Sequence, residues 1–145
     1  RQRQMCIRDS TSTHLDLIRE GQEISELKVM NTQAQEEVKQ AQTLCERFHC
    51  PVFSAGDFNA MDHGGYDEVY DAPSVYEYLS DTLTDTKKKA KKKTAGNAKK
   101  VSAPTYDHIF LCGEAVIHRY TILSDHAMEA MSDHYPIFID VSTKA

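Results

Sequence analysis

Acidic, amide and imidazole side chains stand at the ends of four predicted strands. His14 lies in TSTHLDL, and Asp57 and Asn59 follow the small and apolar run VFSAG. Asp107 opens YDHIFL, and His134 lies in SDHYP, immediately before an apolar strand. Carboxylates bind hard cations, and an Asp–His pair holds or moves protons near neutral pH. Because strand ends in layered folds converge on one rim of the sheets, these residues predict a single polar site.

Each of these residues also has a purely structural interpretation. Asp57 and Asn59 follow a glycine, where such residues commonly form turns. However, two residues at i and i+2 in an extended chain point their side chains to the same side. Asp107 shares a predicted core face with apolar residues of its strand, and a buried carboxylate needs a partner such as His134. His14 taken alone is better explained as a structural histidine of a strand.

The hydrophobic pattern predicts the elements that position these side chains. Residues 11–17 alternate as a short strand, and residues 22–48 place apolar side chains three and four apart, as on one face of a helix. Thr32 followed by Gln35 leaves open a helix that begins only there. Residues 52–55 form the next strand, which completes a strand–helix–strand unit of a layered α/β or α+β domain.

The second half of the chain mixes helix, loop and strand signals. Residues 66–79 are predicted to be helical in pieces, interrupted at Pro73, with Ser74 as a possible N-cap. Eight of the 17 basic residues lie in residues 87–100, and we expect residues 86–103 to form a basic flexible loop. Three further strands are predicted at residues 106–111, 115–123 and 135–141.

The composition fits one domain with a packed core. The chain has 145 residues, of which 40% are hydrophobic and 27% charged. It contains no run of eighteen apolar residues, so no transmembrane segment is predicted, and no obligate protein partner is evident. A net charge of −5 does not indicate a general nucleic-acid binder. Residues 1–10 are polar and patternless, and we expect them to be a non-native or disordered start.

Four short motifs together resemble the endonuclease/exonuclease/phosphatase superfamily, which has the deoxyribonuclease I-like fold. They are THLD at 13–16, GDFN at 56–59, YDHIF at 106–110 and SDHYP at 132–136, in the order of the family. The resemblance covers residues 11–142 and corresponds to the C-terminal half of the family's domain. It implies an α/β (α+β) fold that is part of a four-layer sandwich, two β-sheets flanked by helices, with the N-terminal half missing. Residues 11–145 would then form the C-terminal portion of one such domain.

The same resemblance implies a phosphoesterase that hydrolyses phosphodiesters or phosphomonoesters with Mg²⁺ or Mn²⁺. His14 corresponds to a histidine that hydrogen-bonds the phosphate. Asp57 would orient or deprotonate the attacking water, and Asn59 would fix Asp57 and steady the phosphoryl oxygens. Asp107 would hold the tautomer of His134, which would face the scissile phosphate.

The metal site is where this sequence departs from the family. By resemblance Asp133 belongs to the metal shell, but the family's principal metal ligand is a Glu of the upstream half, which has no match in this chain. We therefore expect the chain alone to be poorly stable and inactive, and a non-catalytic interaction module that keeps the fold remains the alternative. The substrate is open among nucleic acids, phospholipid headgroups and small phosphoesters, and the basic segment favours a polyanion.

Overall fold

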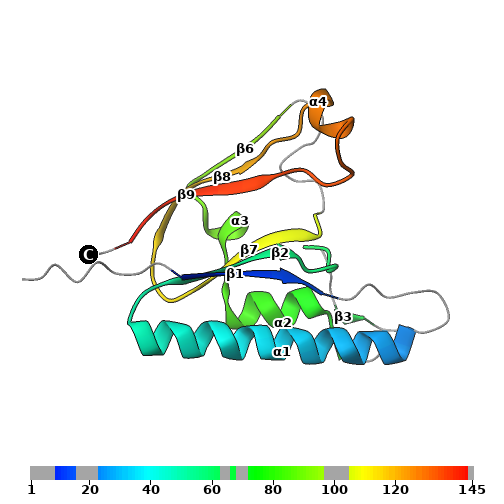
Figure 1. Ribbon diagram of the computed structural model, residues 1–145, viewed down its shortest axis with the longest axis vertical. Coiled ribbons are helices and arrows are strands. Elements are labelled where there is room, and N and C mark those ends of the chain that lie inside the picture. The colour runs from blue at the N-terminus through cyan, green and yellow to red at the C-terminus, as the bar shows by residue number, and fades with distance from the viewer. Residues whose placement is uncertain (1–8, 16–22, 63–65, 68–71, 97–104, 144–145) are drawn as a thin grey trace, which may run out of the picture.

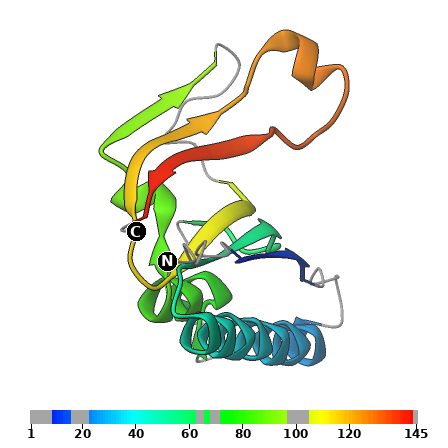
Figure 2. The same ribbon diagram turned by 60° about the vertical axis from the view of Figure 1, so that its left-hand side comes forward.

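The computed structural model describes residues 9–15, 23–62, 66–67, 72–96 and 105–143 (Figure 1). The fold is α+β, with two mixed sheets that face each other and two helices on the outer face of one sheet (Figures 1 and 2). The helices are α1 (Glu23–Phe48), α2 (Val75–Thr82), α3 (Thr86–Lys89) and α4 (His126–Glu129). The strands are β1 (Asp9–His14), β2 (Val52–Asp57), β3 (Tyr66–Asp67), β4 (Ala72–Pro73), β5 (Thr84–Asp85), β6 (Lys92–Ala95), β7 (Asp107–Cys112), β8 (Val116–Ile122) and β9 (Ile137–Ser142).

The first sheet has the strand order β1-β2-β7-β5. β1 is parallel to β2, so α1 is the crossover connection that the strand–helix–strand pattern predicts. β7 pairs antiparallel with both β2 and β5. Of the start predicted at residues 1–10 as non-native or disordered, residues 1–8 lie outside the described part of the chain. Residues 9–10 instead belong to β1, because they pair with Val52 and Phe53 of β2.

The second sheet has the order β6-β8-β9, with β6 parallel and β9 antiparallel to β8. β8 and β9 confirm the strands predicted at residues 115–123 and 135–141. β3 and β4 form a separate two-stranded ribbon, so the prediction of helix is wrong at the residues of these two strands, whereas residues 68–71 lie outside the described part of the chain. The predicted cap is confirmed, since the Ser74 hydroxyl accepts a hydrogen bond from the backbone N–H of Glu77 at 3.1 Å and α2 begins there.

The hydrophobic core has two parts, one on each face of the first sheet. Val52 and Phe110 are fully buried against α1 and α2. Their neighbours in the strands, Phe53 and Leu111, pack between the two sheets instead. Because side chains alternate along a strand, Asp57 and Asp107 belong to the face that looks toward the second sheet. The end of this intersheet face is where the candidate site lies.

α1 is one continuous helix, which rejects the alternative start at Thr32. The Thr32 hydroxyl donates to the carbonyl oxygen of Lys28, one turn earlier in the same helix, at 2.9 Å. Within the described residues, no helix combines the length and the hydropathy that crossing a bilayer requires.

The prediction of a basic flexible loop at residues 86–103 is wrong for the first part of this segment, which forms α3 and β6. Asp85 caps α3 by accepting from the backbone N–H of Lys87 at 2.7 Å. The Thr86 hydroxyl donates to the carbonyl oxygen of Ile109 in β7 at 2.6 Å, which anchors the helix to the first sheet. These local bonds organise the segment despite its lysine-rich composition. Residues 97–104 lie outside the described part.

The lysines of this segment divide into a buried one and exposed ones. The side chain of Lys87 is only 11% exposed and pairs with Asp62. Lys92 and Lys93 are exposed on β6, the outermost strand of the second sheet. Charged side chains on an edge strand discourage pairing with other chains, so edge protection is sufficient to explain these two lysines.

Gly56 allows β1 and β2 to approach each other. Its φ is +153°, and a Cβ atom built there would lie 1.8 Å from the carbonyl oxygen of Thr13. We therefore expect Gly56→Ala to destabilise the chain by roughly 2–4 kcal/mol, because both the backbone conformation and the contact between strands become strained. Urea unfolding followed by circular dichroism measures this loss, and a change below about 0.5 kcal/mol would contradict it.

Candidate active site

Three adjacent strands place His14, Asp57 and Asp107 in one row across the end of the first sheet. In the strand register His14 is opposite Asp57, and Asp57 is opposite Asp107. Directly paired residues of neighbouring strands have their side chains on the same face. The structure therefore brings together three side chains that lie 43 and 50 positions apart in the sequence. Asp16 of the THLD motif lies outside the described residues.

Asp57 is oriented by the turn that follows β2. Its Oδ1 accepts the backbone N–H of Asn59 at 2.8 Å, and Asn59 adopts a φ of 49°, which Asn tolerates better than most residues. The Asn59 side chain donates to the carbonyl oxygen of Leu15 at 2.6 Å and so ties the end of β1 to this turn. Asn59 therefore contacts Asp57 through its main chain, while its side-chain amide joins the strands.

His134 reaches this row from the loop before β9 in the second sheet. Its Nδ1 lies 2.8 Å from Oδ2 of Asp107. A carboxylate accepts, so Nδ1 carries the proton and Nε2 is directed away from Asp107. The backbone N–H of His134 donates to the Ser132 hydroxyl at 3.0 Å, which helps to shape this turn. The Asp107–His134 pairing predicted from the sequence is therefore present in the structure.

The remaining oxygen of Asp57 faces two imidazoles. Oδ2 lies 3.7 Å from Nε2 of His14 and 3.8 Å from Nε2 of His134. Both distances are too long for direct hydrogen bonds and are suited to a bridging water or a phosphoryl oxygen. The Asp57 side chain is 18% exposed, whereas that of His14 is 77% exposed. The carboxylate is thus recessed between two more accessible imidazoles.

A cavity of about 570 Å³ adjoins the row. One wall comes from the intersheet face of the first sheet, including Gly56 and Asp107. The opposite wall comes from His134, Tyr135 and Met128, the last of which belongs to α4. The polar row lies at one side of this cavity, so a ligand held there would be within reach of both sheets.

Asp133, which the family resemblance assigns to the metal shell, is exposed beside the site. It lines a smaller hollow of about 180 Å³ together with Asp107 and His134. Within the part of the chain that the structure describes, no three His, Cys, Asp or Glu side chains are grouped closely enough to hold a metal ion. The described residues alone therefore do not build the divalent-metal site that the resemblance implies.

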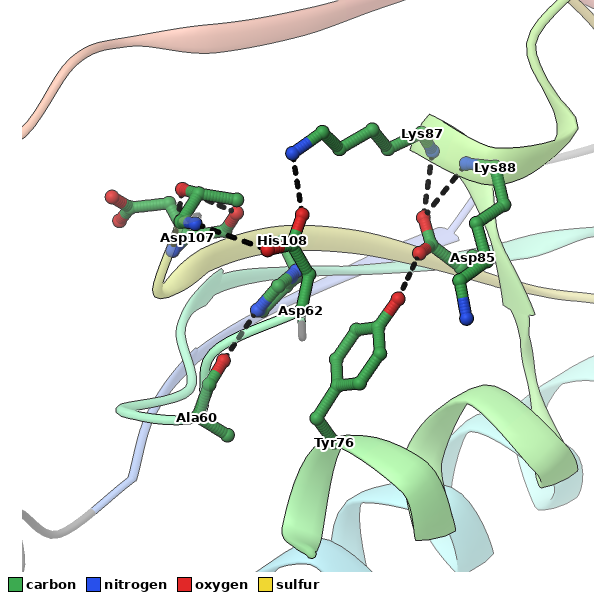
Figure 3. Close-up of polar contacts among 9 residues, drawn as sticks. Ala60, Asp62, Tyr76, Asp85, Lys87, Lys88, Asp107 and His108 are labelled. Atoms are coloured by element: carbon green, nitrogen blue, oxygen red, sulfur yellow. Dashed lines mark hydrogen bonds and ion pairs between the residues drawn. The ribbon is translucent and has the colours of Figure 1, made fainter. Parts of the chain in front are cut away.

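A buried polar network behind the site was not predicted as part of it. Lys87 forms an ion pair with Asp62 (Figure 3). Oδ1 of Asp62 accepts the backbone N–H of Thr105 at 3.3 Å. His108 bonds the carbonyl oxygen of Ala60 at 2.7 Å through Nε2, and burial lowers its pKa, so it is a neutral structural histidine. The sequence signal that was available is Asp62 itself, an acid three residues after the GDFN motif, although its lysine partner is indicated by no local pattern.

The Asp107–His134 pair predicts a measurable pH effect. The hydrogen bond to Asp107 and the charge of Asp107 raise the pKa of His134 above its usual 6.5. The pair therefore stabilises the fold fully below the unfolded-state pKa, and this stabilisation is lost as the pH rises through the folded-state pKa. We expect Asp107→Asn to lower the pKa of His134, measured by NMR titration of its ring protons.

In the same variant, the stability difference from the original chain should be larger at pH 6 than at pH 9. The His134 side chain is 43% exposed, so solvent screening keeps this difference below about 1 kcal/mol. The ring-proton signals of His118, an exposed histidine of β8, serve as the internal reference for these spectra. An unchanged pKa of His134 would contradict the assignment of the hydrogen bond.

Known structures share this arrangement of strands and helices. No protein-family model matches the sequence, and no curated protein matches it. A mannosyl-6-phosphatase from Bacteroides thetaiotaomicron is 21% identical, with a TM-score of 0.64 over 92% of this chain and 51% of that one. An endonuclease/exonuclease/phosphatase family protein from the same organism is 21% identical, with a TM-score of 0.62 over 91% and 49% of the two chains.

A conserved protein of unknown function from Enterococcus faecalis is 17% identical, with a TM-score of 0.66 over 93% of this chain and 50% of that one. The chain thus spans about half the length of each of these structures. The chain has the endonuclease/exonuclease/phosphatase, deoxyribonuclease I-like fold, and it represents about half of that fold.

Proposed function

We propose that this chain carries the Asp–His half of the active site of a divalent-metal-dependent phosphoesterase. The observation that supports this most directly is the position of the Asp57 carboxylate. Its Oδ2 lies 3.7 and 3.8 Å from two imidazole nitrogens, and one of these imidazoles is held by Asp107 at 2.8 Å. A carboxylate and two imidazoles around one small gap suit the binding and activation of a water beside a phosphoryl group.

The residues present suggest how the proton and the charge are handled. Displacement at phosphorus places negative charge on the phosphoryl oxygens and on the leaving oxygen. His14 and His134, when protonated, donate hydrogen bonds to such oxygens, and the hydrogen bond to Asp107 raises the pKa of His134 and so favours its protonated form. Asp57, held by the backbone N–H of Asn59, orients a water and accepts its proton. The position of Asp107 keeps Nε2 of His134 turned toward the gap.

The metal dependence is a proposal about the longer domain of which this fold is half. The described residues group no three suitable ligands, so a carboxylate from outside them must complete a Mg²⁺ or Mn²⁺ site. Asp133 is the residue of this chain that we propose for the metal shell. This requirement also underlies our proposal that the chain by itself is inactive.

The substrate is proposed only as a phosphoester. The fold is shared with a mannosyl-6-phosphatase, which supports a phosphoester substrate without deciding its class. Nucleic acids, phospholipid headgroups and small phosphoesters all present the phosphoryl oxygens that the two imidazoles suit.

The proposed function is tested by phosphoester hydrolysis with and without metal. The samples are the chain alone and the chain extended through the upstream reading frame, each assayed on p-nitrophenyl phosphate and bis-p-nitrophenyl phosphate. We expect turnover by the extended protein with Mg²⁺ or Mn²⁺, its loss on adding EDTA, and none by the chain alone. Turnover by the chain alone would contradict its proposed inactivity, and a folded extended protein without turnover on either substrate or on nucleic acid would favour the non-catalytic module.

A further inference from the structure

We propose that Lys87 and Asp62 are positioning residues, which hold Asp107 where it can fix the tautomer of His134. The contacts that carry this proposal run to the turn before β7 rather than to the gap between Asp57 and the two imidazoles. Their proposed role is to lock together the segment that follows Asp57 at the end of β2 and the turn that precedes Asp107 at the start of β7. The consequence of this role for catalysis rests on the proposed function. The effect on the position of Asp107 and on the tautomer of His134 can be measured without any turnover.

The first step is the link from Lys87 to the turn that precedes β7. The Lys87 ammonium donates to Oδ2 of Asp62 (Figure 3). The two side chains are 11% and 5% exposed. Oδ1 of the same carboxylate accepts the backbone N–H of Thr105 at 3.3 Å. One carboxylate thus joins α3 to the turn that leads into Asp107.

The second step is the link from Thr105 to Asp107. The Thr105 hydroxyl lies 3.2 Å from the backbone nitrogen of Asp107, from which it accepts, and 3.2 Å from its carbonyl oxygen. Thr105 is itself buried, with 5% of its surface exposed. The chain of contacts therefore runs from a buried ammonium, through a buried carboxylate and a buried threonine, to the backbone of the residue that binds His134.

Asp62 is also placed to hold the other strand end. It follows the Asp57–Asn59 turn closely, and two bonds connect that segment to β7 and to the residue that precedes β7. The backbone N–H of Phe58 donates to the carbonyl oxygen of Tyr106 at 3.0 Å, and His108 bonds the carbonyl oxygen of Ala60 at 2.7 Å. The ion pair lies where the two loops meet, so loosening it affects the spacing of both aspartates.

Stability alone is a weak explanation for such a pair. Removing two charges from water offsets most of their attraction, and apolar residues of the same size are often as stabilising. A buried pair does, however, demand one geometry, because its donors and acceptors must all be satisfied. In this protein that geometry fixes the turn that precedes Asp107.

The test reads the tautomer of His134 rather than any reaction. The ¹⁵N shifts of an imidazole ring, recorded at a pH above its pKa, distinguish a proton on Nδ1 from one on Nε2. In the original chain we expect the Nδ1–H form that Asp107 selects. In Lys87→Met we expect a mixture in which the Nε2–H form is readily detected, and Lys87→Arg should restore the original tautomer because it returns a cation to Asp62.

Three further variants keep this test decisive. Lys92→Met removes an exposed lysine charge, and Ser54→Ala removes a buried hydrogen bond to Glu37 on the helix-facing side of the first sheet. Neither should change the tautomer. Thr105→Val removes only the hydroxyl contacts to Asp107 and should shift the tautomer in the same direction as Lys87→Met, which decides the matter if that variant does not fold.

The proposal is overturned by either of two results. One is a folded Lys87→Met or Thr105→Val protein whose His134 keeps the original tautomer. The other is an equal shift in Ser54→Ala, which would show that any loss of stability loosens the site. Absence of phosphoesterase activity in the extended protein would overturn the proposed function and leave this result standing, so the two failures are distinguishable.

Discussion

Replacing His134 by alanine is expected to lower the turnover of the phosphoesterase proposed above by about 10²–10⁴-fold. His134 is the side chain that joins the two halves of the site, since Nδ1 binds Asp107 and Nε2 faces Asp57 at 3.8 Å. Its removal deletes a hydrogen-bond donor to the phosphoryl group and leaves the Asp107 carboxylate without this partner. The measurement is kcat and KM on p-nitrophenyl or bis-p-nitrophenyl phosphate with the chain extended upstream.

The control for this prediction is another histidine of the same sheet. His118 is exposed in β8 and bonds the Ser142 hydroxyl at 2.8 Å, at the end of the sheet opposite to His134. His118→Ala should leave kcat within about twofold, because its side chain contacts none of the reacting groups. If His134→Ala kept its fold and lost less than tenfold, the assignment of His134 to the chemistry would be wrong.

Replacing Lys87 by methionine is expected to lower the free energy of unfolding by about 3–5 kcal/mol. The substitution keeps most of the side-chain volume but leaves the Asp62 carboxylate buried without the ammonium that neutralises it. An uncompensated buried charge is among the few single changes with so large an effect. The loss is measured from the midpoint of urea unfolding, followed by circular dichroism.

Two controls test whether the loss of stability comes from the buried charge of Asp62 or from removing any lysine of this segment. Lys92→Met changes an exposed lysine of the same basic segment and should alter stability by no more than about 0.5 kcal/mol. The double variant Lys87→Met with Asp62→Leu removes both charges of the pair and should recover part of the loss, because neither of these two charges then stays buried. The recovery is incomplete because the backbone N–H of Thr105 loses its carboxylate acceptor. A loss below about 1 kcal/mol in Lys87→Met would contradict the burial of this ion pair.

Much of the candidate site was predictable because it depends on local patterns. Alternation along a strand places Asp57 and Asp107 on a defined face, and a carboxylate on a core face calls for a partner such as His134. The N-cap at Ser74 and the helix before β2 could likewise be predicted from local sequence, since capping and a 3.6-residue period are properties of a few consecutive residues. The motif resemblance then indicated the fold that the structure has.

Other features were not predictable because they depend on partners far along the chain. The lysine-rich composition predicts a solvated loop. The Lys87 side chain is instead buried, and its ammonium pairs with the carboxylate of a residue 25 positions earlier in the sequence. Tyr66 and Asp67 pair with Pro73 and Ala72 as a ribbon, although the local pattern favours helix. In both cases a tertiary contact outweighs a local average.

The sequence by itself determined which residue types stand at the strand ends, which faces they occupy and which strands and helix support them. Only the tertiary structure decided that His14, Asp57 and Asp107 share one register row and that His134 arrives from the opposite sheet. Register depends on the pairing of whole strands, and the contact between sheets depends on how the two cores pack. These are sums over many distant contacts, whereas side-chain type and alternation are properties of neighbouring residues.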